Sequence, residues 1–125
     1  MKKIFDFILR QIRHLVAACR YSLAGVAASA KTETAFRQEL LLGVVHFVAM
    51  WLLQVSALQA LILSALWCGI LVVELLNTAI EAVVDLSAPD YHDLAKKAKD
   101  AASAAVALVL IAYLASWGVV LFVNK

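Results

Sequence analysis

A run of 34 residues without Asp, Glu, Lys or Arg, Leu40–Val73, limits the fold more than any other feature of the chain. A helix that spans the hydrocarbon core of a bilayer needs about 20 residues, so the run is too long for one span. Polar residues between Gln54 and Gln59 interrupt it near the middle. The sequence therefore predicts two transmembrane helices, at 35–53 and 60–85, joined by a short turn.

A second run without charged residues, from 101 to 124, predicts a third transmembrane helix at 101–123. Residues 86–92 hold the one proline and several polar residues, which is typical of a connecting loop. Charged residues make up 16% of the chain, whereas a soluble domain has about 25%. Because glycine and proline are also scarce, we expect an all-α membrane helix bundle forming a single membrane domain, 1–125.

The first 30 residues have a different pattern, in which apolar residues recur with the period of a helix. These residues are Ile4, Phe5, Ile8, Leu9, Ile12, Leu15, Val16 and Cys19. Basic residues flank or oppose the apolar stripe, so we expect an amphipathic helix over 1–30 that lies on the membrane surface. A helix packed on a soluble partner is the alternative. Asp6 and Arg10 interrupt the first apolar run, which argues against a secretory signal.

Basic residues are distributed unevenly along the chain. Seven lie in the segment up to Arg37 and three lie in 96–99, whereas the turn near Gln54 has none. Ten of the 11 therefore fall on one side of the predicted membrane. By the positive-inside rule, the N-terminus and the second loop are cytoplasmic, where ATP is available.

Four polar residues of the second predicted span share one helical face: Glu74, Asn77, Glu81 and Asp85. At 100° per residue they lie within a stripe about 80° wide, and Glu74 and Glu81 are roughly 10 Å apart. A carboxyl group inside a span costs about 2.5–3.5 kcal/mol to insert, which favours a functional site. The alternative is a stripe that only joins helices through hydrogen bonds. Three spans are not expected to shield this stripe, so we also predict self-association.

Two further polar clusters flank the predicted spans. Glu33 and Arg37 have i,i+4 spacing, which fits either a helical ion pair or a Glu33 carboxylate that joins Glu81 in holding Mg²⁺. The lysines of 96–99 stand at the entry to the third span, with Asp100 close behind. They could neutralise a triphosphate with the help of free amides at the helix start, or only anchor the helix at the membrane surface.

Several familiar sites are absent from the sequence. It has no GxxxxGK[ST] loop, and its four glycines cannot form the glycine-rich loop of protein kinases. Cys19 and Cys68 match neither a metal motif nor a disulfide framework. The three histidines are not spaced as a metal site, and we expect His46 to be a hydrogen-bonded polar residue within the first span. No nucleic-acid partner is expected.

Four segments, in order and over nearly the whole chain, resemble the prokaryotic diacylglycerol kinase family. They are Ala35-Phe36-Arg37-Gln38-Glu39, Glu74-Leu75-Leu76-Asn77-Thr78-Ala79-Ile80-Glu81-Ala82-Val83-Val84-Asp85, Tyr91-His92 and Ala98-Lys99-Asp100-Ala101-Ala102-Ser103-Ala104-Ala105-Val106. The resemblance implies a surface helix, three spans and a homotrimer in the bacterial inner membrane. It also implies phosphorylation of diacylglycerol to phosphatidic acid by ATP with Mg²⁺.

The resemblance further implies a role for particular residues. Glu74 would be the general base, supported by Asn77, and Glu33 and Glu81 would hold the metal that bridges the ATP phosphates. The nucleotide would be contacted by His14, Tyr21, Glu33, Glu81, Asp90, Tyr91, His92, Lys99 and Asp100. The lipid would be contacted by Cys19, Ser22, Ala35, Phe36, Arg37, Gln38, Glu39, Glu74, Asn77, Ser103 and Trp117. His14 stands where we expect an arginine, and Ala27 and Ala30 stand where bulkier residues are common.

Three other functions fit parts of the sequence. An undecaprenol kinase of the same family would share the mechanism and differ only in its lipid; Tyr91-His92 and Ser103 favour the diacylglycerol type. A proton-coupled transporter or channel would need polar residues continuing toward the outer leaflet, but Cys68–Val72 contains no ionisable group apart from the cysteine. A non-catalytic assembly subunit would not need the Glu74 carboxyl group.

Overall fold

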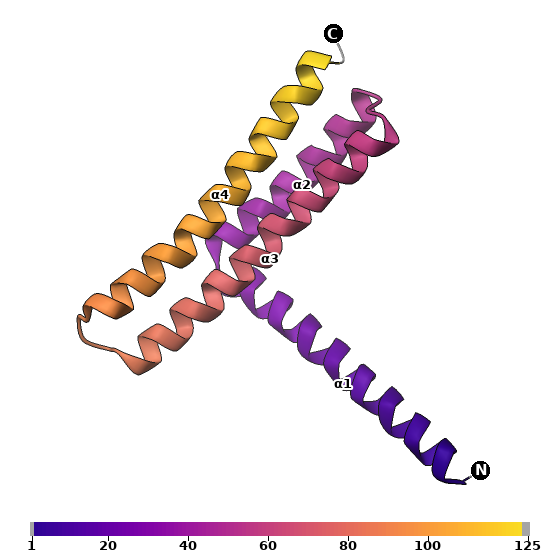
Figure 1. Cartoon of the computed structure of the whole chain (residues 1–125), viewed down its shortest axis with the longest axis vertical. Helices are drawn as coiled ribbons and strands as arrows, with labels where there is room; N and C mark the ends of the chain where they lie inside the picture. The colour runs from indigo at the N-terminus through magenta and orange to yellow at the C-terminus, as the bar shows by residue number, and fades with distance from the viewer. Residues whose placement is uncertain (1, 124–125) are drawn as a thin grey trace. The chain divides into compact units, whose positions relative to one another are not determined.

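Four α-helices make up the computed structural model, which describes residues 2–123 (Figure 1). They are α1 (Lys2–Thr32), α2 (Thr34–Leu52), α3 (Ala57–Ser87) and α4 (Asp93–Val123). The chain divides into two compact units, the first formed by α1 and the second by α2, α3 and α4. Three of the helices, α2, α3 and α4, are long and apolar enough to cross a membrane. The predicted all-α class and the three candidate spans are therefore confirmed.

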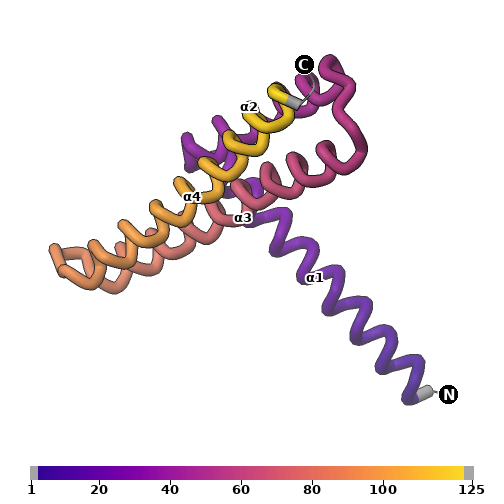
Figure 2. Tube along the Cα trace, turned by 45° about the horizontal axis from the view of Figure 1, so that its top comes forward, coloured from indigo at the N-terminus to yellow at the C-terminus, as the bar shows by residue number. Residues whose placement is uncertain are grey.

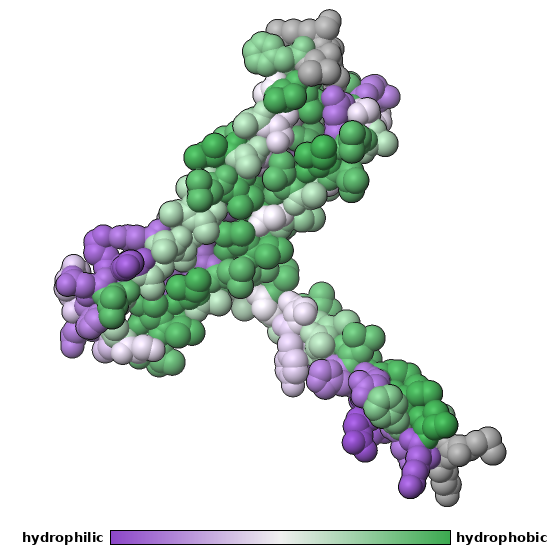
Figure 3. Space-filling view, in the orientation of Figure 1, coloured by the Kyte–Doolittle hydropathy of each residue, from purple (hydrophilic) through white to green (hydrophobic). Residues whose placement is uncertain are grey.

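The helix α1 carries apolar and polar side chains on different faces. Its large apolar side chains, such as Ile4, Phe5 and Ile8, are exposed. Figure 3 shows them along one edge of the helix, with the polar side chains gathered beside them. The helix is thus amphipathic over its length, as the helical period of its sequence predicts, and it continues to Thr32.

A capping box starts α3 immediately after the short turn that follows α2. The backbone N–H of Gln59 donates to Ser56 Oγ at 3.3 Å, and the backbone N–H of Ser56 donates to Gln59 Oε1 at 2.8 Å. Gln54 has a positive φ of 50°, a conformation typical of a tight turn. The polar residues expected to form a turn therefore also build the start of the next helix, which begins at Ala57 rather than at 60.

A second short connection, residues 88–92, joins α3 to α4. His92 caps α4, because its ring Nδ1 accepts from the backbone N–H of Leu94 at 3.2 Å and its carbonyl accepts from Lys96 at 3.0 Å. The helix α4 thus begins at Asp93, and the lysines of 96–99 lie on helix rather than before it. At this helix start the backbone N–H groups of Leu94 and Lys96 are both bonded to His92, so these two amides are not free for a ligand.

The helices α3 and α4 are longer than a bilayer requires. Each has 31 residues, which corresponds to about 46 Å of helix against a hydrocarbon core of about 30 Å. They run antiparallel, and their joined ends extend past the start of α2 (Figures 1 and 2). Polar residues gather at this joined end, whereas the rest of the unit is mostly apolar on its surface (Figure 3). This α3–α4 hairpin end therefore suits an aqueous surface.

The core of the second unit is small and lies along α3, which contacts both α2 and α4. Its fully buried large side chains are Phe36, Leu63, Ile70, His46 and Tyr113. Most other large apolar side chains are exposed in a single copy, among them Leu41, Val44, Leu61, Val72, Leu108 and Ile111. So much exposed apolar surface would be unfavourable in water, which fits a unit surrounded by lipid or by other copies of the chain.

A polar pair lies inside this core. The Tyr113 hydroxyl, from α4, and the His46 ring Nδ1, from α2, are hydrogen-bonded at 3.0 Å. Both side chains are almost completely buried, and aromatic rings of Phe47, Trp67 and Trp117 surround His46. The prediction that His46 is a hydrogen-bonded polar residue of the first span is confirmed.

Replacing Tyr113 by Phe should destabilise the second unit by about 0.6–1.7 kcal/mol, the range for hydrogen bonds between membrane helices. The variant keeps the ring but leaves His46 Nδ1 without its bond from α4. Unfolding in detergent, compared with that of Tyr21→Phe, whose hydroxyl is exposed on α1, measures the difference. Equal stability of the two variants would show that the buried bond contributes nothing.

Candidate functional site

Glu74 is a buried carboxylic acid in the middle of α3. It is 5% exposed in a single copy of the chain. It lines a cavity of about 340 Å³ to which all three helices of the second unit contribute. The lining consists of Ala35, Gln38, Glu39, Leu42, Glu74, Val106 and Leu110. The described lining is apolar apart from Gln38 and the two acidic side chains, and it includes no basic residue.

The burial of Glu74 corrects one expectation from the sequence. We expected that three spans of one chain could not shield the polar stripe, so that a partner had to cover it. For Glu74 this is wrong, because α2 and α4 already cover the residue within one copy. Asn77 and Glu81, further along α3, are only half-buried. Shielding of Glu74 therefore no longer argues for an oligomer.

Glu39 faces the same cavity from α2, and its charge is close enough to act on Glu74. Its Oε2 atom is buried and has no hydrogen-bond partner within the part of the chain that the structure describes. An unpaired buried carboxylate oxygen is unfavourable, and it can be satisfied by a ligand that donates a hydrogen bond. A hydroxyl group in an otherwise apolar molecule has the chemistry that this cavity would accept.

Asn77 and Glu81 continue the polar face of α3 toward the hairpin end. The Asn77 side-chain Nδ2 donates to Glu81 Oε1 at 3.2 Å, across one helical turn. The Asn77 Oδ1 atom is buried, and the described residues offer it no hydrogen-bond partner. The predicted common face of Glu74, Asn77 and Glu81 is therefore present, and the amide holds the Glu81 carboxylate in place.

The two predicted metal ligands, Glu33 and Glu81, both lie near Glu74. Their charges act on its carboxyl group, although Glu33 precedes α2 and Glu81 is on α3. Among the described residues, no three His, Cys, Asp or Glu side chains form a metal cluster. Two carboxylates and the unpaired Asn77 oxygen nevertheless fit Mg²⁺, which binds through one or two carboxylates together with substrate phosphates and water.

The α3–α4 hairpin end holds a second cavity, of about 420 Å³. Predicted nucleotide contacts meet there: Asp90, Tyr91, His92, Lys99 and Asp100 all line it. Lys99 Nζ lies 2.6 Å from Asp85 Oδ1, which links α4 to α3, and Lys96 Nζ lies 2.5 Å from Asp100 Oδ2. Tyr91 donates to Asp93 at 3.0 Å. This cavity combines lysine and acidic side chains at an exposed helix end, a combination that suits a hydrated, multiply charged ligand.

The sequence did not predict the ion pair between Asp85 and Lys99. Asp85 was assigned to the polar stripe of α3, and Lys99 was assigned to phosphate binding or anchoring. Their pairing depends on how α3 and α4 align as antiparallel helices, which the sequence does not specify. One sequence pattern could have suggested this ion pair: an acidic residue near the end of one helix is followed by a basic residue near the start of the next helix.

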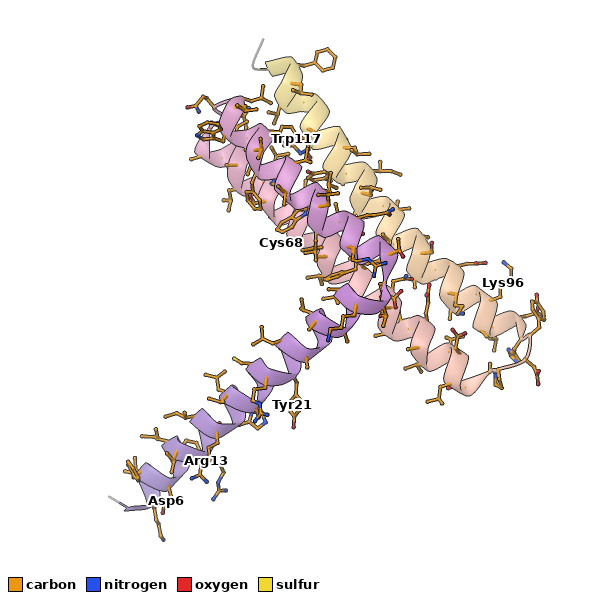
Figure 4. The ribbon with its side chains drawn as sticks, turned by 180° about the vertical axis from the view of Figure 1, so that it is seen from behind. Asp6, Arg13, Tyr21, Cys68, Lys96 and Trp117 are labelled. Carbon is orange, nitrogen blue, oxygen red and sulfur yellow. The ribbon has the colours of Figure 1, made fainter. Side chains whose placement is uncertain are left out.

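Some of the predicted lipid contacts lie outside the Glu74 cavity. Phe36 is part of the helix core, Ser103 is exposed, and Arg37 donates through Nη2 to Thr34 Oγ1 at 3.0 Å. Trp117 contacts the His46 ring, with the ring centroids 5.6 Å apart. In Figure 4 Trp117 lies toward the end of α4 opposite Lys96. Ala35, Gln38 and Glu39, in contrast, do line the cavity.

The remaining predicted contacts, His14, Cys19, Tyr21 and Ser22, all belong to α1 and are exposed there. Tyr21 and Arg20 line a shallow hollow on this helix together with Ala17 and Ala24. Tyr21 and Arg13, both labelled in Figure 4, extend from the same side of α1. The roles of these four residues stay predictions.

Comparison with known proteins gives one consistent answer. Residues 20–121 match the family model of prokaryotic diacylglycerol kinase. The chain is 41% identical to a diacylglycerol kinase of Pseudomonas aeruginosa over 110 residues, which cover 88% of this chain and 89% of that one. It is 40% identical to a diacylglycerol kinase of Escherichia coli over 111 residues, covering 86% and 88%.

A diacylglycerol kinase of Synechocystis is 42% identical over 100 residues, which cover 79% of this chain and 57% of that longer protein. The range matched by the family model, 20–121, spans the cavity beside Glu74, the polar face of α3 and the hairpin end. The chain belongs to the prokaryotic diacylglycerol kinase family.

Proposed function

We propose that this protein transfers the γ-phosphoryl group of ATP to the hydroxyl group of diacylglycerol and so makes phosphatidic acid. The observation that carries the proposal is the buried Glu74 carboxyl group in a mostly apolar cavity, on the same helix pair as a polar, lysine-bearing helix end. Relatives that are 40–41% identical over most of this chain are named diacylglycerol kinases. The activity follows from the combination of family and site.

The two cavities lie at different depths of the same helix pair, which matches the two substrates. Glu74 and Asp85 are three helical turns apart on α3, roughly 16 Å. Diacylglycerol keeps its acyl chains in the bilayer and its hydroxyl at headgroup depth, whereas ATP comes from water. A lipid in the Glu74 cavity and a nucleotide at the α3–α4 hairpin end would therefore approach each other along the polar face of α3.

Glu74 has the chemistry of a general base for this reaction. Its carboxylate would accept the proton of the lipid hydroxyl as the hydroxyl oxygen attacks the γ-phosphorus atom and the bond to the β-phosphate oxygen breaks. Glu39, on the opposite wall, would orient the hydroxyl by accepting a hydrogen bond through its unpaired Oε2. The apolar lining would keep water away, so that the phosphoryl group goes to the lipid rather than to water.

Residues of the polar face of α3 and of the hairpin end would neutralise the negative charge of the ATP phosphates. Glu33 and Glu81 would hold Mg²⁺, which supplies positive charge to the ATP phosphates when it is bound. Asn77 keeps the Glu81 carboxylate in place through its hydrogen bond. Lys99, now paired with Asp85, would turn to the phosphates when a nucleotide enters the hairpin cavity.

We also propose that the protein works as a homotrimer in the bacterial inner membrane with its N-terminus in the cytoplasm. The distribution of basic residues supports this orientation. Exposed apolar side chains on all three spans leave room for contacts between copies as well as with lipid. Partners of the site would be the lipid, ATP and the neighbouring copies.

Purified protein in mixed micelles should phosphorylate diacylglycerol from labelled ATP. Undecaprenol, offered in the same assay at the same surface fraction, should be a much poorer substrate. If the protein phosphorylates undecaprenol faster than diacylglycerol, the proposed mechanism would stand, but the assigned lipid substrate would be wrong. Failure to phosphorylate either lipid would refute the proposed activity.

Replacing Glu74 by Gln should lower kcat by at least about 100-fold, because the amide cannot accept the hydroxyl proton. The variant preserves the size of the side chain, so the helix unit should remain folded. Initial rates with diacylglycerol, together with an unfolding curve in detergent, measure both effects. Asp6→Asn, the same exchange of acid for amide on exposed α1, is the matched control. Turnover near the wild-type rate would remove Glu74 from the role of base.

Replacing Glu81 by Ala should raise the Mg²⁺ concentration needed for half-maximal activity by about tenfold or more, since one carboxylate ligand is lost. A titration of activity with Mg²⁺ at saturating ATP and lipid tests this, with Glu81→Asp as the variant that keeps a carboxylate. An identical titration curve for wild type and Glu81→Ala would count against the proposed metal site.

A further inference from the structure

Trp67 connects α3 to the backbone of α2 beside the cavity. Its indole Nε1 donates to the carbonyl oxygen of Glu39 at 3.1 Å, although the two residues are 28 positions apart in the chain. Glu39 is the residue whose side chain faces Glu74 across the cavity. An indole N–H inside a membrane unit is a rigid donor, and here it is bonded to the backbone of a site residue.

Gly43 makes this hydrogen bond possible. It lies one helical turn after Glu39 on the same face of α2, and it is buried. A Cβ atom added at Gly43 would overlap the Trp67 indole ring, including its nitrogen. The ring therefore lies directly over the glycine backbone, and that close approach brings Nε1 to the Glu39 carbonyl. Any other residue at 43 would force the ring or the helix to move.

Neighbouring rings keep the Trp67 indole in this orientation. His46 stacks on it, with ring centroids 6.1 Å apart and an interplanar angle of 14°, and Phe47 meets it edge-on at 5.3 Å. His46 is in turn hydrogen-bonded to Tyr113 of α4. Two side chains of α2 thus pack on the ring, and one of them is hydrogen-bonded to α4, so the contact of the ring with Gly43 favours one alignment of α2 on α3.

Trp67 and Glu74 lie on one face of α3. They are seven residues apart, which is two helical turns and roughly 10 Å. Glu39 accepts a hydrogen bond from Trp67 through its backbone carbonyl, and its side chain lines the same cavity as Glu74. A shift of α2 along α3 by one residue, about 1.5 Å, would therefore break the hydrogen bond to Trp67 and move the Glu39 carboxylate relative to Glu74. The position of Trp67 on Gly43 therefore determines where the Glu39 carboxylate stands relative to Glu74.

We propose that Trp67, packed on Gly43, is a positioning residue that sets the alignment of α2 on α3 and so holds the Glu39 carboxylate opposite Glu74 for recognition of the lipid hydroxyl. The proposal rests on the proposed function, because it takes the cavity to be the lipid site. Trp67 touches no substrate in this scheme and acts only through Glu39.

The first test separates binding of the two substrates. Trp67→Phe keeps an aromatic ring but removes the N–H donor, so the KM for diacylglycerol should rise about fivefold, the factor of one hydrogen bond. The KM for ATP should stay within about twofold, since the hairpin cavity is built by other residues. The matched control is Trp51→Phe, because Trp51 is 71% exposed at the other end of α2. An unchanged lipid KM in Trp67→Phe, or equal changes for lipid and ATP, would overturn the proposal.

The second test asks whether Trp67 acts through Glu39. In a Glu39→Ala background, Trp67→Phe should cause no further rise in the lipid KM, because there is no carboxylate left to position. A merely structural role would add its effect in both backgrounds. Additive effects of the two substitutions would therefore contradict the proposed link.

The third test examines the contact without using activity. Gly43→Ala should lower the unfolding temperature in detergent, and Trp67→Leu should relieve this loss in the double variant, because the smaller side chain leaves room for the added methyl group. Equal destabilisation by Gly43→Ala in both backgrounds would refute the packing of Trp67 on Gly43. This rescue is independent of catalysis, so it can succeed even if wild-type protein does not phosphorylate diacylglycerol, and the two failures can be told apart.

Discussion

The burial of the Glu74 carboxyl group among three apolar helices is the constraint on which the rest of the structure depends. A carboxyl group at this depth is costly unless it is covered and given suitable neighbours. The short helix α2 covers it from one side and α4 from the other, and together they leave a cavity beside it. That cavity holds a second acid, Glu39, rather than a base, and the buried Glu39 Oε2 has no hydrogen-bond partner among the described residues, so a ligand that donates a hydrogen bond could satisfy it.

The long helices α3 and α4 extend from this buried site to an aqueous surface. Because α3 and α4 are each longer than the bilayer core, the same pair of helices lines the cavity and carries the lysines and acids of the hairpin end. Asn77 and Glu81 bridge the distance along α3. A lipid kinase needs this combination, since one substrate is confined to the membrane and the other to the cytoplasm. In the proposed function the helix end would supply the charges, so no glycine-rich phosphate loop would be needed.

The sequence predicted the helical class, the three spans and the common face of Glu74, Asn77 and Glu81, because each depends on local periodicity and hydrophobicity. The helix α4 begins before the predicted span, since charged residues can lie on helix beyond the bilayer, and the expectation that one copy leaves Glu74 unshielded is wrong. Nor did the sequence indicate the Trp67–Gly43 contact or the Asp85–Lys99 pair. Those contacts depend on the alignment of neighbouring helices, which a single sequence does not encode in any local pattern.

The central claim is that Glu74 meets the lipid hydroxyl directly, and an experimental structure with diacylglycerol and a non-hydrolysable ATP analogue tests it most directly. We expect the hydroxyl oxygen to lie within about 3 Å of a Glu74 carboxylate oxygen, the reach of a general base, with the γ-phosphate on its other side. A lipid hydroxyl bound away from Glu74, with nucleotide phosphates far from the polar face of α3, would contradict the proposed mechanism.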